Sequence, residues 1–292
     1  MEALRSAIYL LAEAYWPCTV RQIYYLGIGR FWQKDQDGSR RVYNTVCRLL
    51  GDMREDGTVP WGWIADNTRW QRKRTTFTSP EHILRSVAAT YRRDLWIRQP
   101  IHVEVWCESD SIAGVLDDVT MPAGVGLFPC RGQSSKTLVH AAAQSYIPLN
   151  KPVVVLYVGD WDPSGLAIPF SVEDRMARYS DGVELDLRRL AVTPDDVASD
   201  RFITHSVNTR DPNYPRFADR CRRMDLAPQT AVEVEALPPD ELRQRVTDAI
   251  DELTDTQEWL ATLVAEQSER DLLERMVSGD ASAYRQLVAV AS

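Results

Sequence analysis

The sequence predicts an α/β fold, α+β overall, in which a mainly parallel sheet follows an all-helical N-terminal part. The apolar run Val153–Val158 is unbroken, as expected of a central parallel strand that is covered on both faces. Strand-like and helix-like patterns alternate from His102 to Tyr179, which is typical of parallel α/β architecture. The first 100 residues instead carry apolar side chains mostly at helical spacing.

The N-terminal part is predicted to contain three helices and a short extended segment. An amphipathic helix covers Leu4–Ala14, and a second helix, Val20–Leu26, begins after the N-cap Thr19. A third helix begins near Ser39 and turns its arginines outward, and Val59–Ala65 is strand-like. Three helices followed by a small hairpin are typical of a winged helix-turn-helix, whose third helix enters a DNA groove.

The rest of the chain is predicted to alternate between strands and helices and then to become helical. Residues 181–236 contain several prolines and give no clear pattern. The predicted domains are residues 1–75, a linker helix within 76–100, a sheet domain over 101–239 and a helical segment over 240–292. The expected elements after residue 76 are a helix from Ser79 to about Ile97, a strand His102–Cys107, a helix Asp110–Asp118, a strand Gly124–Phe128, a helix Ser134–Tyr146, a strand Val153–Val158, a helix Ser164–Tyr179 and acidic helix from Asp240 to Val290.

Charge is distributed unevenly along the chain. The net charge is −8, yet residues 1–100 contain 16 Lys and Arg against 10 Asp and Glu, and residues 101–292 contain 18 against 32. A basic N-terminal third suits phosphate binding, and the basic segment 69–76 suits a linker lying along a DNA backbone. Chance surface composition is the alternative explanation of this asymmetry.

Acidic side chains follow the predicted central strand. Asp160 and Asp162 come directly after Val153–Val158, where open α/β sheets bind ligands. Two such carboxylates repel each other unless a cation lies between them, and oxygen ligands suit Mg²⁺. The alternative is structural, because Asp162 followed by Pro163 is also a common helix start.

A second acidic residue, Glu108, is predicted to stand at the turn after the strand that ends at Cys107. A Glu after one strand and an Asp-x-Asp after a later parallel strand suit phosphoryl transfer, with the Glu as general acid or base and the aspartates on the metal. Glu104 alternates with apolar residues and is expected on a solvated face. Asp110 is expected to cap a helix.

These motifs carry a family resemblance. Glu108 with Asp160-Trp161-Asp162 resembles the Toprim domain of topoisomerases, primases and overcoming-lysogeny-type nucleases. Residues 130–135 and 162–165 look like the A subunit of topoisomerase VI and the related meiotic double-strand-break protein. The resemblance covers roughly residues 1–180 and implies a winged-helix domain followed by a Toprim-type, Rossmann-like parallel sheet.

The resemblance also implies a tyrosine nucleophile. Thr19–Tyr25 is similar to the Arg-x-x-Tyr-Tyr pattern of that family, whose second tyrosine corresponds to Tyr25. Arg21 lies four residues earlier on the same helix face, where its charge is expected to favour the phenolate and to bind the scissile phosphate. The alternative is that Tyr24 and Tyr25 are aromatic packing.

The activity implied is DNA cleavage through a 5′-phosphotyrosyl link, with Mg²⁺, or Mn²⁺, held by Glu108, Asp160 and Asp162. In the family the tyrosine of one subunit works with the metal of the other, so a homodimer on double-stranded DNA is expected. The chain is closest in size to solitary "mini-A" homologues of phages and mobile elements, and no element for an ATPase partner is recognised. The side chains expected to contact DNA are Arg40, Arg41, Arg48, Arg72, Lys73, Arg74, Arg131 and Lys136.

Two other functions stay open. One is a nuclease that hydrolyses DNA with metal-activated water, and the other is a non-cleaving DNA-binding subunit of a larger complex. The segment Val232–Pro239 resembles a strand of bacterial Toprim proteins. Its Glu235 is either an outer member of the metal site or, as preferred, a solvated edge residue.

Composition favours a cytoplasmic protein, and the DNA cleavage that the resemblance implies would make it nucleoid-associated. No apolar run reaches the roughly 20 residues of a membrane helix, and the N-terminus lacks the pattern of a signal peptide. Five scattered cysteines and four isolated histidines predict reduced thiols and argue against a zinc site.

Overall fold

The computed structural model describes residues 2–35, 40–65, 76–130, 136–199 and 201–279. The chain divides into two compact units. The larger unit consists of residues 1–69 and 101–253, and the smaller unit consists of residues 70–100 and 254–292.

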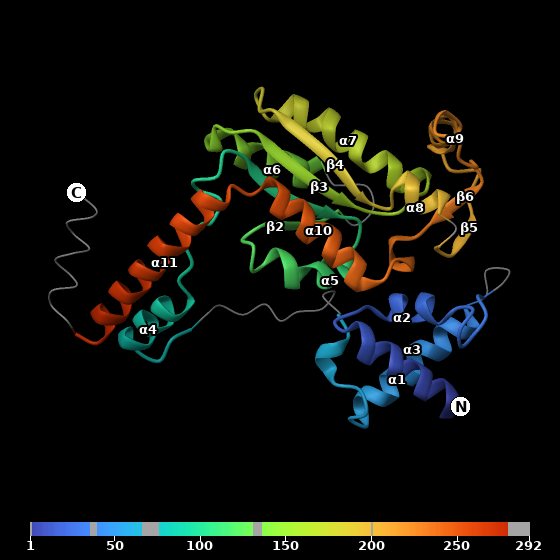
Figure 1. Ribbon diagram of the computed structural model, residues 1–292, viewed down its shortest axis with the longest axis horizontal. Coiled ribbons are helices and arrows are strands. Elements are labelled where there is room, and N and C mark those ends of the chain that lie inside the picture. Colours follow the sequence, from blue (N-terminus) through green and yellow to red (C-terminus); the bar gives the residue numbers. More distant parts are fainter. Residues whose placement is uncertain (1, 36–39, 66–75, 131–135, 200, 280–292) are drawn as a thin grey trace. The chain divides into compact units, whose positions relative to one another are not determined.

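The N-terminal part of the larger unit is helical, with α1 (Glu2–Tyr15), α2 (Val20–Gly27) and α3 (Arg41–Glu55) (Figure 1). Thr19 caps α2 as predicted, and a reciprocal bond from its backbone to Gln22 completes a capping box. The three helices bury one shared apolar core. Its fully buried members include Ile8, Leu50 and Met53.

The prediction that Val59–Ala65 is strand-like is wrong. Trp61–Trp63 forms a short 3-10 helix, η1, instead. Pro60 cannot donate to a strand ladder and Gly62 weakens one, which explains why an extended hairpin arm does not form here. The segment is still tied to the helices, because Cys18 and Ile64 form an isolated parallel bridge.

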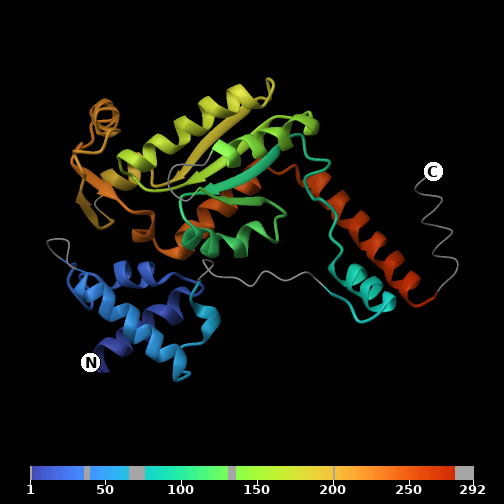
Figure 2. The same cartoon turned by 180° about the vertical axis from the view of Figure 1, so that it is seen from behind.

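The sheet is four-stranded and entirely parallel, with the order β2-β1-β3-β4. Its strands are β1 (His102–Cys107), β2 (Gly126–Pro129), β3 (Val153–Val158) and β4 (Leu185–Ala191) (Figures 1 and 2). Every residue of β3 is buried, as its unbroken apolar run predicted. The α/β class is thus confirmed, although β2 begins two residues later than expected and β4 fell in the unassigned stretch.

Helices cover both faces of this sheet (Figures 1 and 2). On one face α6 (Lys136–Tyr146) packs against α7 (Pro163–Tyr179), and on the other α5 (Asp110–Thr120) packs against α10 (Pro239–Leu253). A short 3-10 helix, η2 (Ile147–Leu149), follows α6. Strands buried on both sides explain the apolar runs of the sequence.

The stretch after α7 contains small elements that local patterns did not predict. Besides β4 it forms α8 (Pro194–Ala198), an antiparallel pair of β5 (Thr204–Ser206) and β6 (Thr230–Val232), and α9 (Tyr214–Arg223) between them. The 3-10 helix η3 (Val234–Ala236) then leads into α10. The elements α8, β5, β6 and η3 have three to five residues, too few to show a hydrophobic period, so no local pattern predicted them.

The smaller unit pairs α4 (Pro80–Thr90) with α11 (Thr256–Val277). Ser79 caps α4 as predicted, but the helix ends at Thr90 rather than near Ile97. The acidic tail predicted to be helical from Asp240 forms two helices, because the chain leaves α10 at Leu253 and starts α11 after the cap Asp255.

The prediction that Glu104 lies on a solvated face of its strand is also wrong. Glu104 is only 5% exposed, on the sheet face that α6 covers. Trp106 Nε1 donates to its Oε2 at 2.9 Å, and the Tyr146 hydroxyl donates to the same oxygen. A strand pattern cannot separate a solvated Glu from one whose partners come from a distant helix.

We expect Tyr146→Phe to destabilise the larger unit by about 1–3 kcal/mol, because a buried carboxylate loses one donor. Tyr179→Phe is the matched control, since Tyr179 is less buried and its ring packs against His140. Chemical denaturation of both variants measures the difference. Equal free energies of unfolding would show that the Tyr146 hydroxyl adds nothing to Glu104.

Candidate functional site

Two predicted site residues meet at the carboxyl edge of the sheet. Glu108 follows β1, and its backbone N–H donates to Val158 O at 3.0 Å. Asp160 follows β3, and its backbone N–H donates to Glu108 Oε2 at 2.9 Å. Adjacent parallel strands end at the same edge, so the register of β1 on β3 brings these side chains together.

Asp162, the third predicted ligand, is also the N-cap of α7. Its Oδ1 accepts the backbone N–H of Gly165 at 2.6 Å. A side chain at Gly165 would place its Cβ 2.4 Å from the Asp160 carbonyl oxygen, so only glycine fits this tight turn. The structural alternative for Asp162 therefore holds, and the cap uses one of its two carboxylate oxygens.

A third acidic segment reaches the same edge from η3. The backbone N–H of Val234 donates to Asp160 Oδ1 at 2.8 Å, and Trp161 bridges to Val232 through the backbone. Glu235 is only 2% exposed, and Ser111 Oγ donates to its Oε1 at 3.4 Å. The prediction of a solvated edge residue is wrong, because the backbone pairing folds this segment against the acidic turn.

Arg21 and Tyr25 on α2 face this acidic segment. Arg21 forms ion pairs with Glu233 at 2.5 Å and with Glu235 at 3.6 Å. The charge of Glu233 acts on the Tyr25 phenol and raises its pKa, and the Lys34 ammonium lies 5.9 Å from the centre of the Tyr25 ring. The shared helix face predicted for Arg21 and Tyr25 is thus turned toward carboxylates.

The pKa values of the buried carboxyl groups are raised. Burial raises the pKa of Glu108, and the charges of Asp162 and Glu235 raise it further. Burial also raises the pKa of Asp160 well above its usual range, with the charges of Glu108 and Glu235 adding to the effect. Negative charge at this edge is therefore poorly compensated, and a cation there would stabilise the ionised forms.

The pKa of the Tyr25 phenol is also raised, chiefly by burial and then by the charge of Glu233. Arg21 lowers it, as predicted, but by less than these two effects raise it. In this arrangement the phenol is neutral and needs a base to become a nucleophile. The sequence showed the arginine but not the glutamate, which lies more than 200 residues further along the chain.

Arg189 of β4 is a positioning residue that the sequence did not indicate. Its half-buried guanidinium donates to the carbonyl oxygens of Gly159 at 2.8 Å and Gly165 at 2.7 Å, and to that of Asp160 at 3.2 Å. It therefore holds the turn that carries the aspartates. An Arg within an alternating strand looks like a solvated residue, so only the tertiary fold reveals this role.

The predicted DNA-contacting residues are divided between described and undescribed parts of the chain. Arg40, Arg41 and Arg48 lie exposed at the start and along α3, where Arg48 pairs with Asp52 at 3.0 Å. Lys136 is exposed at the start of α6. Those that fall outside the described residues are Arg72, Lys73, Arg74 and Arg131.

The donor chemistry at this edge of the sheet fits Mg²⁺. In the part of the chain that the structure describes, no three His, Cys, Asp or Glu side chains gather closely enough to hold a metal ion. Mg²⁺ commonly takes one or two carboxylates and completes its shell with waters and substrate oxygens. Glu108, Asp160 and Asp162 supply that kind of donor. The five cysteines are unpaired thiols scattered through the fold.

Comparison with known proteins gives no family assignment. No protein-family model matches the chain, and no curated protein is significantly similar to it in sequence. Among the described helices, none combines the length and the apolar character needed to span a membrane.

We expect Arg21→Gln to destabilise the larger unit, because Glu235 is buried and loses its counter-charge. The effect should be about 1–3 kcal/mol, the size found when a buried hydrogen-bonded group loses its partner. Arg48→Gln is a matched control on α3, where the pair with Asp52 is exposed. Thermal unfolding compares the two variants, and an equal loss would mean that the Arg21 pairs add no stability.

Proposed function

We propose that this protein cleaves DNA in a Mg²⁺-dependent reaction in which Tyr25 attacks the phosphodiester. The single observation that carries the proposal is the meeting of two motifs from distant parts of the sequence. Arg21 and Tyr25 of α2 face Glu233 and Glu235. The same short segment is bonded to Asp160 through the Val234 N–H.

The proposed architecture is a winged-helix-like N-terminal part and a Toprim-type sheet, as in topoisomerase VI A subunits. The four-stranded parallel sheet and the carboxylates at its edge support the second assignment. The three packed helices support the first, while the segment after α3 forms η1.

In the proposed reaction the Tyr25 Oη bonds to phosphorus, and the bond from phosphorus to the 3′ oxygen breaks, which leaves a 5′-phosphotyrosyl link. Glu233, whose charge acts on the phenol, takes its proton. Glu108, which accepts the Asp160 N–H at the same edge of the sheet, gives a proton to the leaving 3′ oxygen. One P–O bond forms and one breaks, and the proton lost by Tyr25 is matched by the proton gained by the 3′ oxygen. Attack of the 3′ hydroxyl on the phosphotyrosyl link reverses the reaction.

Asp160 and Asp162, with Glu108, are the residues that would hold Mg²⁺ or Mn²⁺. A bound divalent ion would neutralise charge on the phosphate that is cleaved. Arg21 would exchange its carboxylate partners for that phosphate when DNA enters, because a guanidinium pairs well with either group. Arg40, Arg41, Arg48 and Lys136 supply sequence-independent contacts to duplex DNA.

A homodimer remains part of the proposal, because the resembling family combines the tyrosine of one subunit with the metal of the other. The described residues of one chain already bring Tyr25 near the acidic segment. In the proposed homodimer each chain would therefore contribute both a tyrosine and an acidic site, and an ATPase partner is not required for cleavage.

Hydrolysis by metal-activated water is the second candidate. The observation that favours it is the burial of Tyr25, which is 7% exposed and whose pKa is raised. Such a phenol is a poor nucleophile until Glu233 or a conformational change activates it. A non-cleaving DNA-binding role is the third candidate and would leave the acidic edge without a chemical task.

Quenching reactions on supercoiled DNA with detergent separates the three candidates. Tyrosine attack predicts Mg²⁺-dependent nicked or linear DNA that stays bound to protein until protease is added. Hydrolysis predicts the same DNA products free of protein. Intact DNA in both Mg²⁺ and Mn²⁺ would refute cleavage altogether, and binding that persists would then favour the non-cleaving role.

A further inference from the structure

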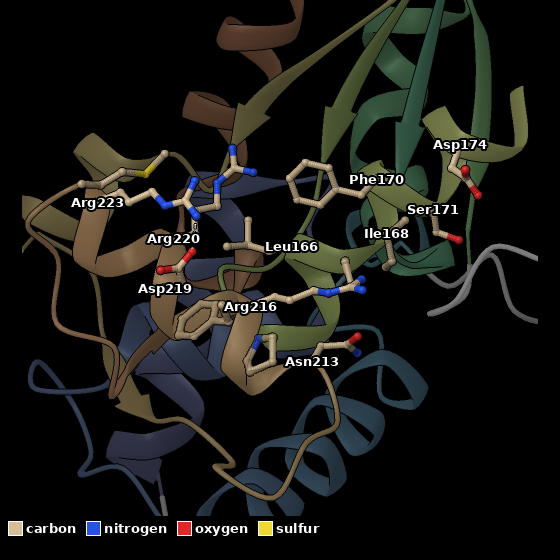
Figure 3. Close-up of a pocket in the computed structure, with 14 residues that line it drawn as sticks. Leu166, Ile168, Phe170, Ser171, Asp174, Asn213, Arg216, Asp219, Arg220 and Arg223 are labelled. Atoms are coloured by element: carbon tan, nitrogen blue, oxygen red, sulfur yellow. Dashed lines mark hydrogen bonds and ion pairs between the residues drawn. The ribbon is translucent and has the colours of Figure 1, made fainter. Parts of the chain in front are cut away.

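A pocket of about 1020 Å³ lies between α7 and α9 (Figure 3). Its lining begins at Pro163, the residue after Asp162. The apolar part of the lining includes Leu166, Phe170 and Met224. Phe170 is 51% exposed, which leaves an aromatic ring open to a ligand.

Arginines line the other wall of this pocket. Arg216, Arg220 and Arg223 all come from α9, which carries four arginines and one acidic residue. The guanidinium of Arg220 lies 4.9 Å from the centre of the Phe170 ring. This basic helix sits within the part of the chain, residues 101–292, where acidic residues exceed basic ones. The pocket thus offers a ring and positive charge side by side.

The pocket is built onto the acidic turn. Trp161, between the two aspartates, is buried and packs edge-on against Phe217 of α9 at 6.3 Å. Ser164 Oγ at the start of α7 donates to Asp211 at 2.9 Å, just before α9. A strand of DNA held in the pocket would therefore lie close to the carboxylates of the candidate site.

We propose that the α7–α9 pocket binds an unpaired segment of DNA, with a base against Phe170 and phosphates on Arg216 and Arg223. Aromatic rings interleaved with arginines are how proteins hold single strands, because every base has a face to stack and every linkage a charge. A duplex keeps its bases stacked and would leave Phe170 unused. The volume suits a ligand of one or two nucleotides.

The inference rests on the proposed function only in taking DNA as the substrate. Its test is binding without metal, measured by fluorescence anisotropy of a labelled single-stranded oligonucleotide in the presence of EDTA. Arg216→Ala and Arg223→Ala are compared with Arg222→Ala. Arg222 is an exposed arginine of the same helix that does not line the pocket, so it controls for net charge.

We expect Arg216→Ala and Arg223→Ala each to weaken binding and to reduce the slope of log affinity against log salt by about 0.7. Arg222→Ala should leave both nearly unchanged. Asp219→Asn should tighten binding, because it removes the carboxylate that pairs with Arg223. Equal losses in all three arginine variants would show general electrostatic attraction and overturn the pocket assignment.

The aromatic part of the proposal has its own test. Phe170→Leu keeps an apolar side chain at an exposed position, so folding should be preserved, yet we expect roughly tenfold weaker binding to the single strand. A duplex of the same length should bind Phe170→Leu and wild type equally. An unchanged single-strand affinity in Phe170→Leu would overturn base stacking at this site.

These outcomes are distinguishable from failure of the proposed function. Single-strand binding that depends on Arg216 and Phe170, without any DNA cleavage, would keep this inference and refute the cleavage proposal. Cleavage by wild type, with binding that none of the pocket variants changes, would do the reverse.

Discussion

Replacing Tyr25 with phenylalanine is expected to abolish covalent attachment of the protein to DNA and to reduce cleavage roughly a thousandfold or more, since the nucleophile is gone. The substitution removes one hydroxyl and keeps the ring that packs edge-on against Tyr24. The fold should therefore persist. Its stability should stay close to that of wild type, because the raised pKa keeps the phenol neutral and its loss removes no charge.

Tyr24→Phe is the matched control for this experiment. Tyr24 is the neighbouring tyrosine, and its hydroxyl accepts the backbone N–H of Asp35 at 3.0 Å and approaches the carboxylate at 3.3 Å. Its loss should reduce stability by about 1 kcal/mol and leave cleavage near wild type. Cleavage that survives in Tyr25→Phe but not in Tyr24→Phe would show that Tyr24, and not Tyr25, is the nucleophile.

Replacing Glu108 with glutamine is expected to lower the cleavage rate about 10²–10⁴-fold, as is usual when a general acid or base is removed. The amide keeps the shape of the side chain and can still accept the Asp160 N–H. DNA binding without metal should be unchanged. A wild-type rate in Glu108→Gln would remove this residue from the reaction.

The same variant should unfold at a higher temperature at neutral pH. The pKa of Glu108 is raised in the folded protein, so folded molecules bind this proton more tightly than unfolded ones. Stability from the group is therefore present below its ordinary pKa of 4.5 and is lost as the pH rises through its folded pKa. Glu108→Gln should remove that loss, and each kcal/mol regained should raise the melting temperature by roughly 2–4 °C.

The pH dependence of stability separates the effect of the Glu108 charge from a general stabilisation by the substitution. The contribution of Glu108 should lower the free energy of unfolding of wild type between acidic and neutral pH. The free energy of unfolding of Glu108→Gln should depend less on pH. Mg²⁺ should raise the melting temperature of wild type more than that of the variant, because bound ligand stabilises the folded state. An identical Mg²⁺ effect in both proteins would place the ion elsewhere.

The sheet was predictable because its signal is local. Val153–Val158 forms a strand with the predicted bounds, and Glu108 and Asp160 meet because parallel strands end at a common edge. Thr19 and Ser79 were recognised as caps because capping depends on neighbouring residues only. The hydrophobic period and the capping residues therefore predicted most of the helices and strands.

The rest of the site depends on contacts that no local pattern contains. Glu233 and Glu235 reach Arg21 from more than 200 residues away, through a segment whose pairing with Trp161 is visible only in the fold. Arg189 holds the acidic turn by bonds to carbonyl oxygens, which the sequence does not show. The exposure of Glu104 was predicted wrongly for the same reason, because its hydrogen-bond donor Tyr146 lies on α6.

The most direct test of the account is to locate the DNA on the protein. Wild type is incubated with DNA and Mg²⁺, quenched with detergent, digested with nuclease and protease, and analysed by peptide mass spectrometry. We expect a nucleotide joined through its 5′ phosphate to the peptide that contains Tyr25, and no such adduct in Glu108→Gln. Cleaved DNA with free 5′ phosphates and an unmodified Tyr25 peptide would contradict it.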